Sequence, residues 1–214
     1  MQLCEAQTLA ARVVKLLWPH CARIQVAGSV RRKKADGIKD IEIVATPRII
    51  TRTEQINLLE YREVETSLLH RFALSSQCPL RWIKTGVPEI VPWTPKPDAK
   101  HLRAMLPESW VDPRLRSESP EGIKLDLFLA TPRNWGAIML IRTGSRDFNR
   151  AVMTHALKMN RPSHKGFFHE DGSPVDTREE RDVFALLGLC PVEPARRRGF
   201  GDVRPIHPVN RRRP

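Results

Sequence analysis

Apolar residues near the start of the chain recur at helical spacing and then give way to simple alternation. Residues 3–17 carry an apolar stripe that predicts an amphipathic helix, which Pro19 ends. Polar and apolar residues alternate over 23–27, and acids alternate with apolar residues at the start of a second stretch over 40–45. These two stretches predict strands that flank a basic loop.

The middle of the chain has a weaker pattern. Residues 54–74 contain leucines at helical spacing and predict a helix, and residues 81–84 predict a short strand. Residues 88–122 contain seven of the 18 prolines. Because proline interrupts regular elements, we expect a long surface excursion there.

Regular periodicity returns after this proline-rich stretch. Residues 124–130 are an alternating stretch broken by one acid and predict a strand. Helices are predicted over 131–141 and 147–159. The pattern therefore predicts a mixture of strands and helices along the whole chain.

The last part of the chain is predicted to hold a hairpin, a helix and a basic tail. Asp171-Gly172 is a hairpin-type turn between apolar residues. Thr177 and Glu180 have capping-box spacing before an apolar run, which predicts a helix that ends at Gly188. Residues 195–214 then contain seven arginines and a single acid, so the tail is an electrostatic appendage or a solubilising end.

Charge adds the first functional information. Of the 214 residues, 41% are hydrophobic, which is ordinary for a protein with a packed core. The chain has 36 Lys and Arg residues against 24 Asp and Glu, a formal net charge of +12. Such an excess indicates a polyanionic partner.

Other classes of protein are excluded by the same composition. The apolar runs are far shorter than the ~20 residues that a membrane-spanning helix needs. Charged residues interrupt the first twenty positions, which argues against a secretory signal. The four cysteines have no paired-ligand spacing, so no zinc ribbon or disulfide framework is expected. We therefore expect a cytoplasmic protein with reduced thiols and no membrane partner.

Three acids stand out in the predicted strands. Asp40 and Glu42 are two positions apart, so their side chains leave the same face of a strand, and Asp126 is alone in an apolar strand. An unpaired carboxylate there is costly unless it meets a base or a metal. The Arg31–Lys34 run or a divalent metal would relieve the repulsion. Two Mg²⁺ ions and phosphoryl transfer fit such an oxygen-rich site.

A second pattern complements the acids. Gly28-Ser29 ends a strand with a turn whose backbone N–H groups and hydroxyl could approach phosphate oxygens, and Arg31 and Arg32 could supply guanidinium groups to the same phosphates. The alternative is an ordinary strand, turn and strand with surface salt bridges. That alternative leaves Asp126 unexplained.

Taken together and in order, these motifs resemble those of family X DNA polymerases. The residues that carry the resemblance are Gly28-Ser29-Val30-Arg31-Arg32, Asp40-Ile41-Glu42, Lys124-Leu125-Asp126-Leu127, Thr143 to Asn149, Glu179 to Leu189 and the basic segment after Pro194. The resemblance implies an α+β fold, with a nucleotidyltransferase palm of mixed β-sheet and flanking helices followed by a small α/β thumb. It implies a palm at 1–142, a thumb at 143–198 and a basic C-terminal tail at 199–214.

The resemblance also implies roles for individual residues. Catalysis and the binding of two Mg²⁺ ions, for which Mn²⁺ can substitute, fall to Asp40, Glu42 and Asp126. Nucleotide binding falls to Gly28, Ser29, Arg32, Thr143, Gly144 and Asn149: Ser29 and Arg32 on the triphosphate, the Thr143-Gly144 turn under the sugar, and Asn149 at the minor-groove edge of the base. Arg196, Arg197 and Arg198 are expected on DNA phosphates, whereas Arg142 is equally consistent with a phosphate contact and a solvent-facing position.

The chain also departs from the family's pattern. Glu42 stands where the family commonly has Asp, and Ile141-Arg142 stands where many members have an aromatic pair that screens ribose from deoxyribose. Few residues precede Gly28, so we expect neither helix-hairpin-helix segments nor lyase activity. Sugar preference is therefore left open.

The sequence thus predicts a monomeric, Mg²⁺-dependent DNA polymerase of family X type. We expect it to use nucleoside triphosphates and to extend the 3′ hydroxyl of primer-template or gapped DNA, as in the filling of short gaps in DNA repair. One alternative is a template-independent nucleotidyltransferase that acts on another acceptor. The other is an inactive, basic nucleic-acid-binding module.

Overall fold

The computed structural model describes residues 1–57, 60–84, 94–96, 99–118, 120–159, 173 and 175–206. Its contacts divide the chain into two compact units. The first contains Met1–Val26 and Ala35–Ala130, and the second contains Ala27–Lys34 and the residues described from 131 onward. The later boundary between these two contact-based units falls at Ala130.

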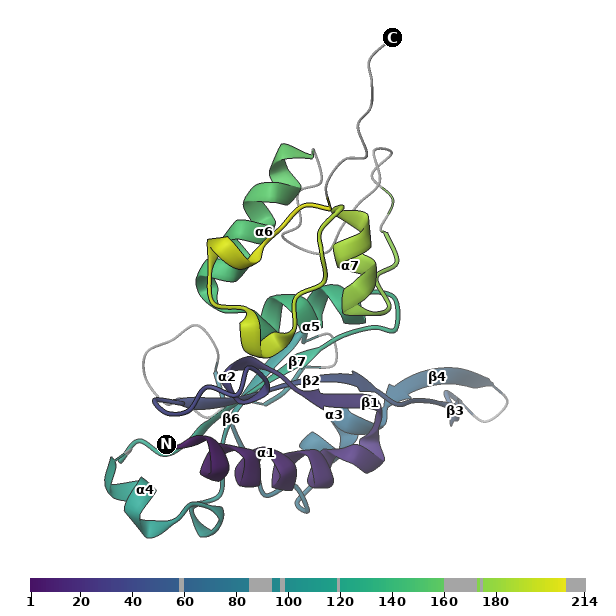
Figure 1. Ribbon diagram of the computed structural model, residues 1–214. Helices are drawn as coiled ribbons and strands as arrows, with labels where there is room; N and C mark the ends of the chain where they lie inside the picture. The colour runs from purple at the N-terminus through teal and green to yellow at the C-terminus, as the bar shows by residue number, and fades with distance from the viewer. Residues whose placement is uncertain are drawn as a thin grey trace. The chain divides into compact units, whose positions relative to one another are not determined.

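A five-stranded mixed sheet forms the first unit (Figure 1). Its strands are, in spatial order, β1 (Cys21–Val26), β2 (Asp40–Pro47), β7 (Lys124–Leu129), β6 (His101–Met105) and β5 (Arg81–Ile83). β2 and β7 are parallel, and the other neighbours are antiparallel. The α+β class with a mixed sheet is confirmed.

One face of this sheet is covered by helices. α1 (Leu3–Leu17) packs on β1 and β2, and α3 (Leu68–Ala73) also contacts β2 (Figure 1). A short 3-10 turn, η1 (Trp18–His20), joins α1 to β1. Along β2, the fully buried Ile41 and Ile43 alternate with partly exposed acids. The sheet therefore has an apolar face for the helices and an opposite face that carries carboxylates.

The helix predicted over 54–74 is wrong. β3 (Ile49–Gln55) and β4 (Tyr61–Ser67) pair as an antiparallel hairpin, and only α3 follows as a helix. The β-branched residues of these strands favour extended backbone. Between the two strands, the side-chain oxygen of Asn57 accepts a hydrogen bond from the Glu60 backbone N–H at 3.0 Å.

The surface excursion predicted over 88–122 is also wrong for part of its length. β6 lies inside the sheet between β7 and β5, and η2 (Glu108–Trp110) and α4 (Pro113–Glu118) follow it. Leu102 and Ala104 are buried and alternate with polar residues, as in other half-buried strands. The prolines lie on either side of this strand and none lies within it.

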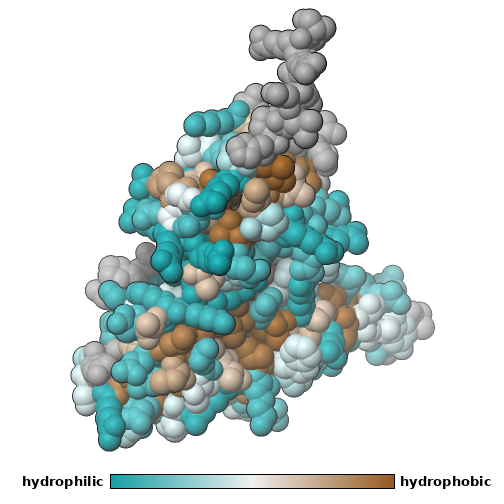
Figure 2. Space-filling view, in the orientation of Figure 1, coloured by the Kyte–Doolittle hydropathy of each residue, from teal (hydrophilic) through white to brown (hydrophobic). Residues whose placement is uncertain are grey.

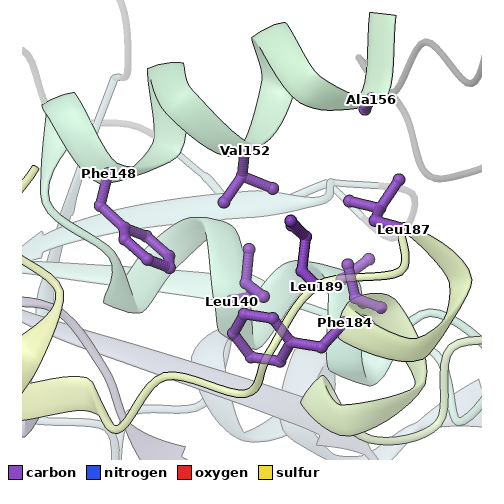
Figure 3. Close-up of a cluster of buried hydrophobic side chains, with 9 residues drawn as sticks. Leu140, Phe148, Val152, Ala156, Phe184, Leu187 and Leu189 are labelled. Atoms are coloured by element: carbon purple, nitrogen blue, oxygen red, sulfur yellow. The ribbon is translucent and has the colours of Figure 1, made fainter. Parts of the chain in front are cut away.

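Four α-helices build the described part of the second unit: α2 (Gly28–Arg31), α5 (Trp135–Thr143), α6 (Arg146–Lys158) and α7 (Glu180–Leu186). The 3-10 turns η3 (Pro194–Arg196) and η4 (Phe200–Asp202) follow. Figure 3 shows the core of this unit, in which Leu140 of α5, Phe148 of α6 and Phe184 of α7 gather. α5 packs on α7 through this core, so it belongs to the second unit.

The helix ends explain the local structure of this unit. The Ser145 hydroxyl accepts a hydrogen bond from the Phe148 backbone N–H and caps α6. The capping box of α7 is formed by Glu179 and Asp182 and not by the predicted Thr177 and Glu180. The predicted end of this helix is confirmed, because Gly188 has a φ of 59°. The hairpin predicted at residues 171–172 lies outside the described residues.

The visible surface is largely hydrophilic (Figure 2), as expected for a chain in which 28% of the residues are charged. Figure 2 shows hydrophilic side chains over much of the visible surface, with smaller apolar patches between them. Among the described residues, no helix is both long enough and apolar enough to cross a membrane.

Candidate functional site

The three predicted carboxylates lie on one face of the sheet. In the parallel pair of β2 and β7, Glu42 is the register partner of Asp126, and Asp40 is the partner of Lys124. Register partners point to the same side, as do residues two apart along a strand. Asp40, Glu42 and Asp126 therefore share the face opposite the one on which Ile41 and Ile43 lie.

Asp126 is held by two side chains from the neighbouring strand β6. Arg103 makes a bidentate contact, with Nε 2.7 Å from Oδ1 and Nη2 2.9 Å from Oδ2. His101 Nε2 is also 2.7 Å from Oδ1. Burial acts to raise the pKa of Asp126, but the hydrogen bonds from His101 and Arg103 outweigh it, so its pKa lies below the ordinary value. Asp126 is a stable carboxylate.

The pKa of Asp40 is shifted in the opposite direction. Its pKa is raised, first by burial and then by the negative charge of Asp126, while Arg103 and Lys124 partly offset both effects. The like charges of Asp40 and Asp126 are thus close enough to repel each other. This repulsion is the strain that a cation on this face would relieve.

The donor set suits a hard divalent cation, because three carboxylates supply the oxygen ligands that Mg²⁺ prefers. Among the described residues, however, no group of three or more His, Cys, Asp or Glu side chains is arranged to hold a metal ion. Arg103 and His101 already occupy Asp126. The carboxylate oxygens are chemically suited to the metal, but the guanidinium of Arg103 contacts both oxygens of Asp126.

The predicted nucleotide-binding residues are brought together in the second unit. Arg32 donates hydrogen bonds to the Ser29 hydroxyl at 3.0 Å, to the Gly144 carbonyl at 3.1 Å and to the Thr143 carbonyl. Gly28, just before Ser29, has a φ of 59°, a conformation that glycine adopts at low cost. The Gly28-Ser29 segment and the Thr143-Gly144 turn are therefore joined by a single guanidinium.

Arg31, the other suggested phosphate ligand, contacts two side chains of the second unit. Its guanidinium donates to the Thr143 hydroxyl at 2.8 Å and to Glu180 Oε2 at 2.6 Å. Arg197 donates to the other carboxylate oxygen of Glu180, also at 2.6 Å. Burial acts to raise the pKa of Glu180, but these two arginines outweigh it and lower that pKa. Glu180 thus links the C-terminal segment to the Thr143 turn.

Arg197 is not available for the predicted DNA contact. It is only 3% exposed, and its guanidinium lies 5.6 Å from the ring centres of both Phe148 and Phe184. A guanidinium over aromatic faces and paired with a carboxylate is a structural cation. The neighbouring Arg196 and Arg198 are exposed, and so is Arg142.

Asn149 lies against the Thr143-Gly144 turn. Its amide nitrogen donates to the Ile141 carbonyl at 2.6 Å, and its buried side-chain oxygen has no hydrogen-bond partner among the described residues. A Cβ added to Gly144 would crowd that oxygen and the Phe148 ring, so a larger residue there would require the Asn149 side chain to shift. The predicted contact of Asn149 with a base stays a prediction.

Sequence reasoning missed three residues of these networks. His101 and Arg103 were hidden in the proline-rich stretch, although the alternation over 101–105 was a usable signal. Glu180 was interpreted as a capping residue. Its partner Arg31 is 149 positions away along the chain, a distance over which no local pattern reports.

Comparison with known proteins gives one family match and one search without a match. The family model described as the DNA polymerase beta thumb matches residues 138–198. The matched range includes α6, α7, Glu180 and the buried Arg197. No curated protein matches the chain. A thumb of this family implies polymerase-like DNA binding, and the match agrees with the predicted palm and thumb architecture.

Proposed function

We propose that this protein, which matches the polymerase beta thumb model over residues 138–198, is a metal-dependent nucleotidyltransferase that extends a DNA 3′ hydroxyl. The observation that carries the proposal is the register of β2 and β7, which gathers Asp40, Glu42 and Asp126 on a single face. Such a cluster is costly for folding, as the raised pKa of Asp40 indicates. A functional requirement for negative charge accounts for that cost.

The carboxylate face would hold the metal. Asp40, Glu42 and Asp126 are the residues with suitable oxygen ligands, for Mg²⁺ or for Mn²⁺. Bound there, the metal would supply positive charge that lowers the pKa of an attacking hydroxyl and offsets the charge of leaving pyrophosphate. The chain itself keeps Asp126 ionised through Arg103 and His101, so that this ligand is a carboxylate at neutral pH.

The second unit would bind the nucleotide. The Ser29 hydroxyl and the Arg32 guanidinium are a donor pair suited to triphosphate oxygens. Arg32 is oriented by the carbonyls of the Thr143-Gly144 turn, and Arg31 fixes the Thr143 hydroxyl. This arrangement orders the donors before the nucleotide arrives, which reduces the entropic cost of binding.

DNA binding would rest on the exposed arginines of the thumb. Arg142, Arg196 and Arg198 are exposed, and contacts of arginine with phosphate carry little sequence information. Affinity should therefore fall steeply with salt and depend weakly on sequence. Short gaps in DNA under repair are the substrate class that we propose.

Primer extension tests this function. Gapped, recessed and single-stranded DNA are compared with deoxyribonucleotides and ribonucleotides, in Mg²⁺ and in Mn²⁺. The wild type should extend gapped or recessed DNA and insert the nucleotide complementary to the template base. Asp126→Asn should abolish extension, whereas Asp112→Asn, which changes an exposed acid of the same unit, should not. No extension by the wild type on any substrate would reject the proposal.

Template dependence separates the proposal from its closest rival. Equal incorporation of all four nucleotides opposite one template base favours a template-independent nucleotidyltransferase. DNA binding without any incorporation favours a module that only binds nucleic acid.

A further inference from the structure

A guanidinium lies on the carboxylate face of the five-stranded sheet, where a metal would have to bind. Arg103 of β6 is the register partner of Asp126, so both side chains point to the same side of the sheet. The contact is bidentate, at 2.7 Å and 2.9 Å. Fork-shaped pairs of this kind are among the strongest hydrogen-bonded ion pairs in proteins.

The lone pairs of Asp126 are nearly all used. A carboxylate offers about four lone-pair positions on its two oxygens. Oδ1 accepts from both His101 and Arg103, and Oδ2 accepts from Arg103. The Asp126 side chain is only 5% exposed, which leaves little room for a further ligand from solvent. A divalent cation can gain full access to this carboxylate only if a donor leaves.

Arg103 also acts on a second predicted ligand. The positive charge of Arg103 attracts the carboxylate of Asp40 as well as that of Asp126. Arg103 therefore neutralises the repulsion between Asp40 and Asp126, which is the electrostatic task of a metal at such a site. A cation tethered to the chain performs it in the absence of a metal.

We propose that Arg103 is an internal counter-cation that competes with the divalent metal for Asp126, so that metal binding requires this arginine to release the carboxylate. The inference rests on the proposed function, because it concerns the metal of that site. Arg103 would stabilise the metal-free protein and raise the metal concentration at which the site fills. Metal, once bound, would replace it as the partner of Asp126.

If Arg103 positioned Asp126 for the metal instead of competing with it, the expected change in metal affinity would have the opposite sign. If Arg103 merely positioned Asp126 for the metal, its removal would leave the ligand misplaced, and the affinity for metal would fall. If Arg103 competes, its removal eliminates both an occupant of the oxygens and a nearby positive charge, and the affinity rises. The sign of the change therefore distinguishes competition from positioning.

Binding of Mn²⁺ to the full chain tests the proposal without any turnover. Free Mn²⁺ is titrated by electron paramagnetic resonance, with neither nucleotide nor DNA present, for the wild type, Arg103→Gln, Arg103→Lys and Arg81→Gln. Arg81 is an exposed arginine of the edge strand β5 and serves as the matched control. Arg103→Gln should bind Mn²⁺ about 10-fold more tightly or better. A neighbouring charge shifts the protonation equilibrium of a carboxylate by about the same factor. Arg81→Gln should bind as the wild type does.

Arg103→Lys keeps the charge but cannot form the bidentate pair, so its affinity should lie between those of the wild type and Arg103→Gln. It decides the matter if circular dichroism finds Arg103→Gln unfolded, and an affinity no higher than that of the wild type then overturns the proposal. Equal or weaker binding by a folded Arg103→Gln, with the wild type still binding, overturns this inference alone. No binding by any form overturns the proposed metal site together with it.

Discussion

Glu180 accepts hydrogen bonds from two arginines in the second unit, and its neutralisation should destabilise that unit. The substitution Glu180→Gln keeps the size of the side chain and removes its charge. Arg31 and Arg197 both lie 2.6 Å from its carboxylate oxygens. The side chains are 16% exposed for Glu180 and 2% exposed for Arg197, so Arg197 would keep a buried charge without a counter-ion.

The magnitude follows from this burial. Removing one partner of a buried ion pair typically costs 3–5 kcal/mol, because the other charge remains desolvated. The amide retains one hydrogen-bond acceptor, which places the expected loss near the lower limit, at about 3 kcal/mol. Glu193→Gln, which neutralises an exposed acid of the same unit, should change the stability by less than about 0.5 kcal/mol.

Native-state hydrogen exchange is the appropriate assay, because it reads the free energy of opening for each unit separately. Amides of α5 and α7 should lose protection in Glu180→Gln, while amides of the five-stranded sheet keep theirs. Adding Arg197→Met to the variant removes the uncompensated charge and should restore about 1 kcal/mol or more.

Two results would refute this reasoning. One is an opening free energy for α5 and α7 that falls by less than about 1 kcal/mol in Glu180→Gln. The other is a double variant no more stable than Glu180→Gln alone. Either result would mean that the charge of Arg197 is solvated in a way that its burial does not indicate.

The remaining predictions concern both units. Asp40→Asn should leave the melting temperature unchanged or raise it, because the substitution removes the repulsion that raises the pKa of Asp40; a clear fall in calorimetry would contradict this. The ion pair of Asp126 has a lowered folded-state pKa, so its stabilisation is present above the unfolded pKa and is lost as the pH falls through the folded pKa. Melting temperatures measured against pH should fall over that acidic range in the wild type and vary less in Asp126→Asn. Gly136→Ala should cost about 3 kcal/mol in urea denaturation, since its Cβ would lie 2.1 Å from the Glu179 carbonyl oxygen, whereas Gly201→Ala, with nothing within 4 Å, should cost far less; equal costs would contradict the geometry.

Much of the fold follows from local patterns. The apolar stripe over 3–17 predicted α1 with its observed bounds, and alternation predicted β1, β2 and β7. These elements are long, strongly periodic and ended by clear signals. The hairpin of β3 and β4 was missed because leucines at helical spacing competed with β-branched residues, and pairing across the turn decided the outcome.

The candidate site was predictable only in part. Strand periodicity is enough to place Asp40 and Glu42 on one face, and the odd acid Asp126 drew attention by its apolar surroundings. Which cation compensates these acids depends on β6, whose position next to β7 is a property of the folded sheet. The same holds for Arg197: a run of three arginines predicts an exposed basic segment, and only packing reveals that the middle one is buried.

The central claim is that the three carboxylates of the first unit form a nucleotidyltransferase site. The most direct test is single-turnover incorporation of one nucleotide into gapped DNA by Asp40→Asn and Glu42→Gln, with DNA affinity measured in parallel. The account predicts a loss of about 1000-fold or more in the rate for each variant, with DNA affinity retained, since metal stabilisation of the transition state is worth several kcal/mol. A rate within about tenfold of the wild type for either variant would contradict it.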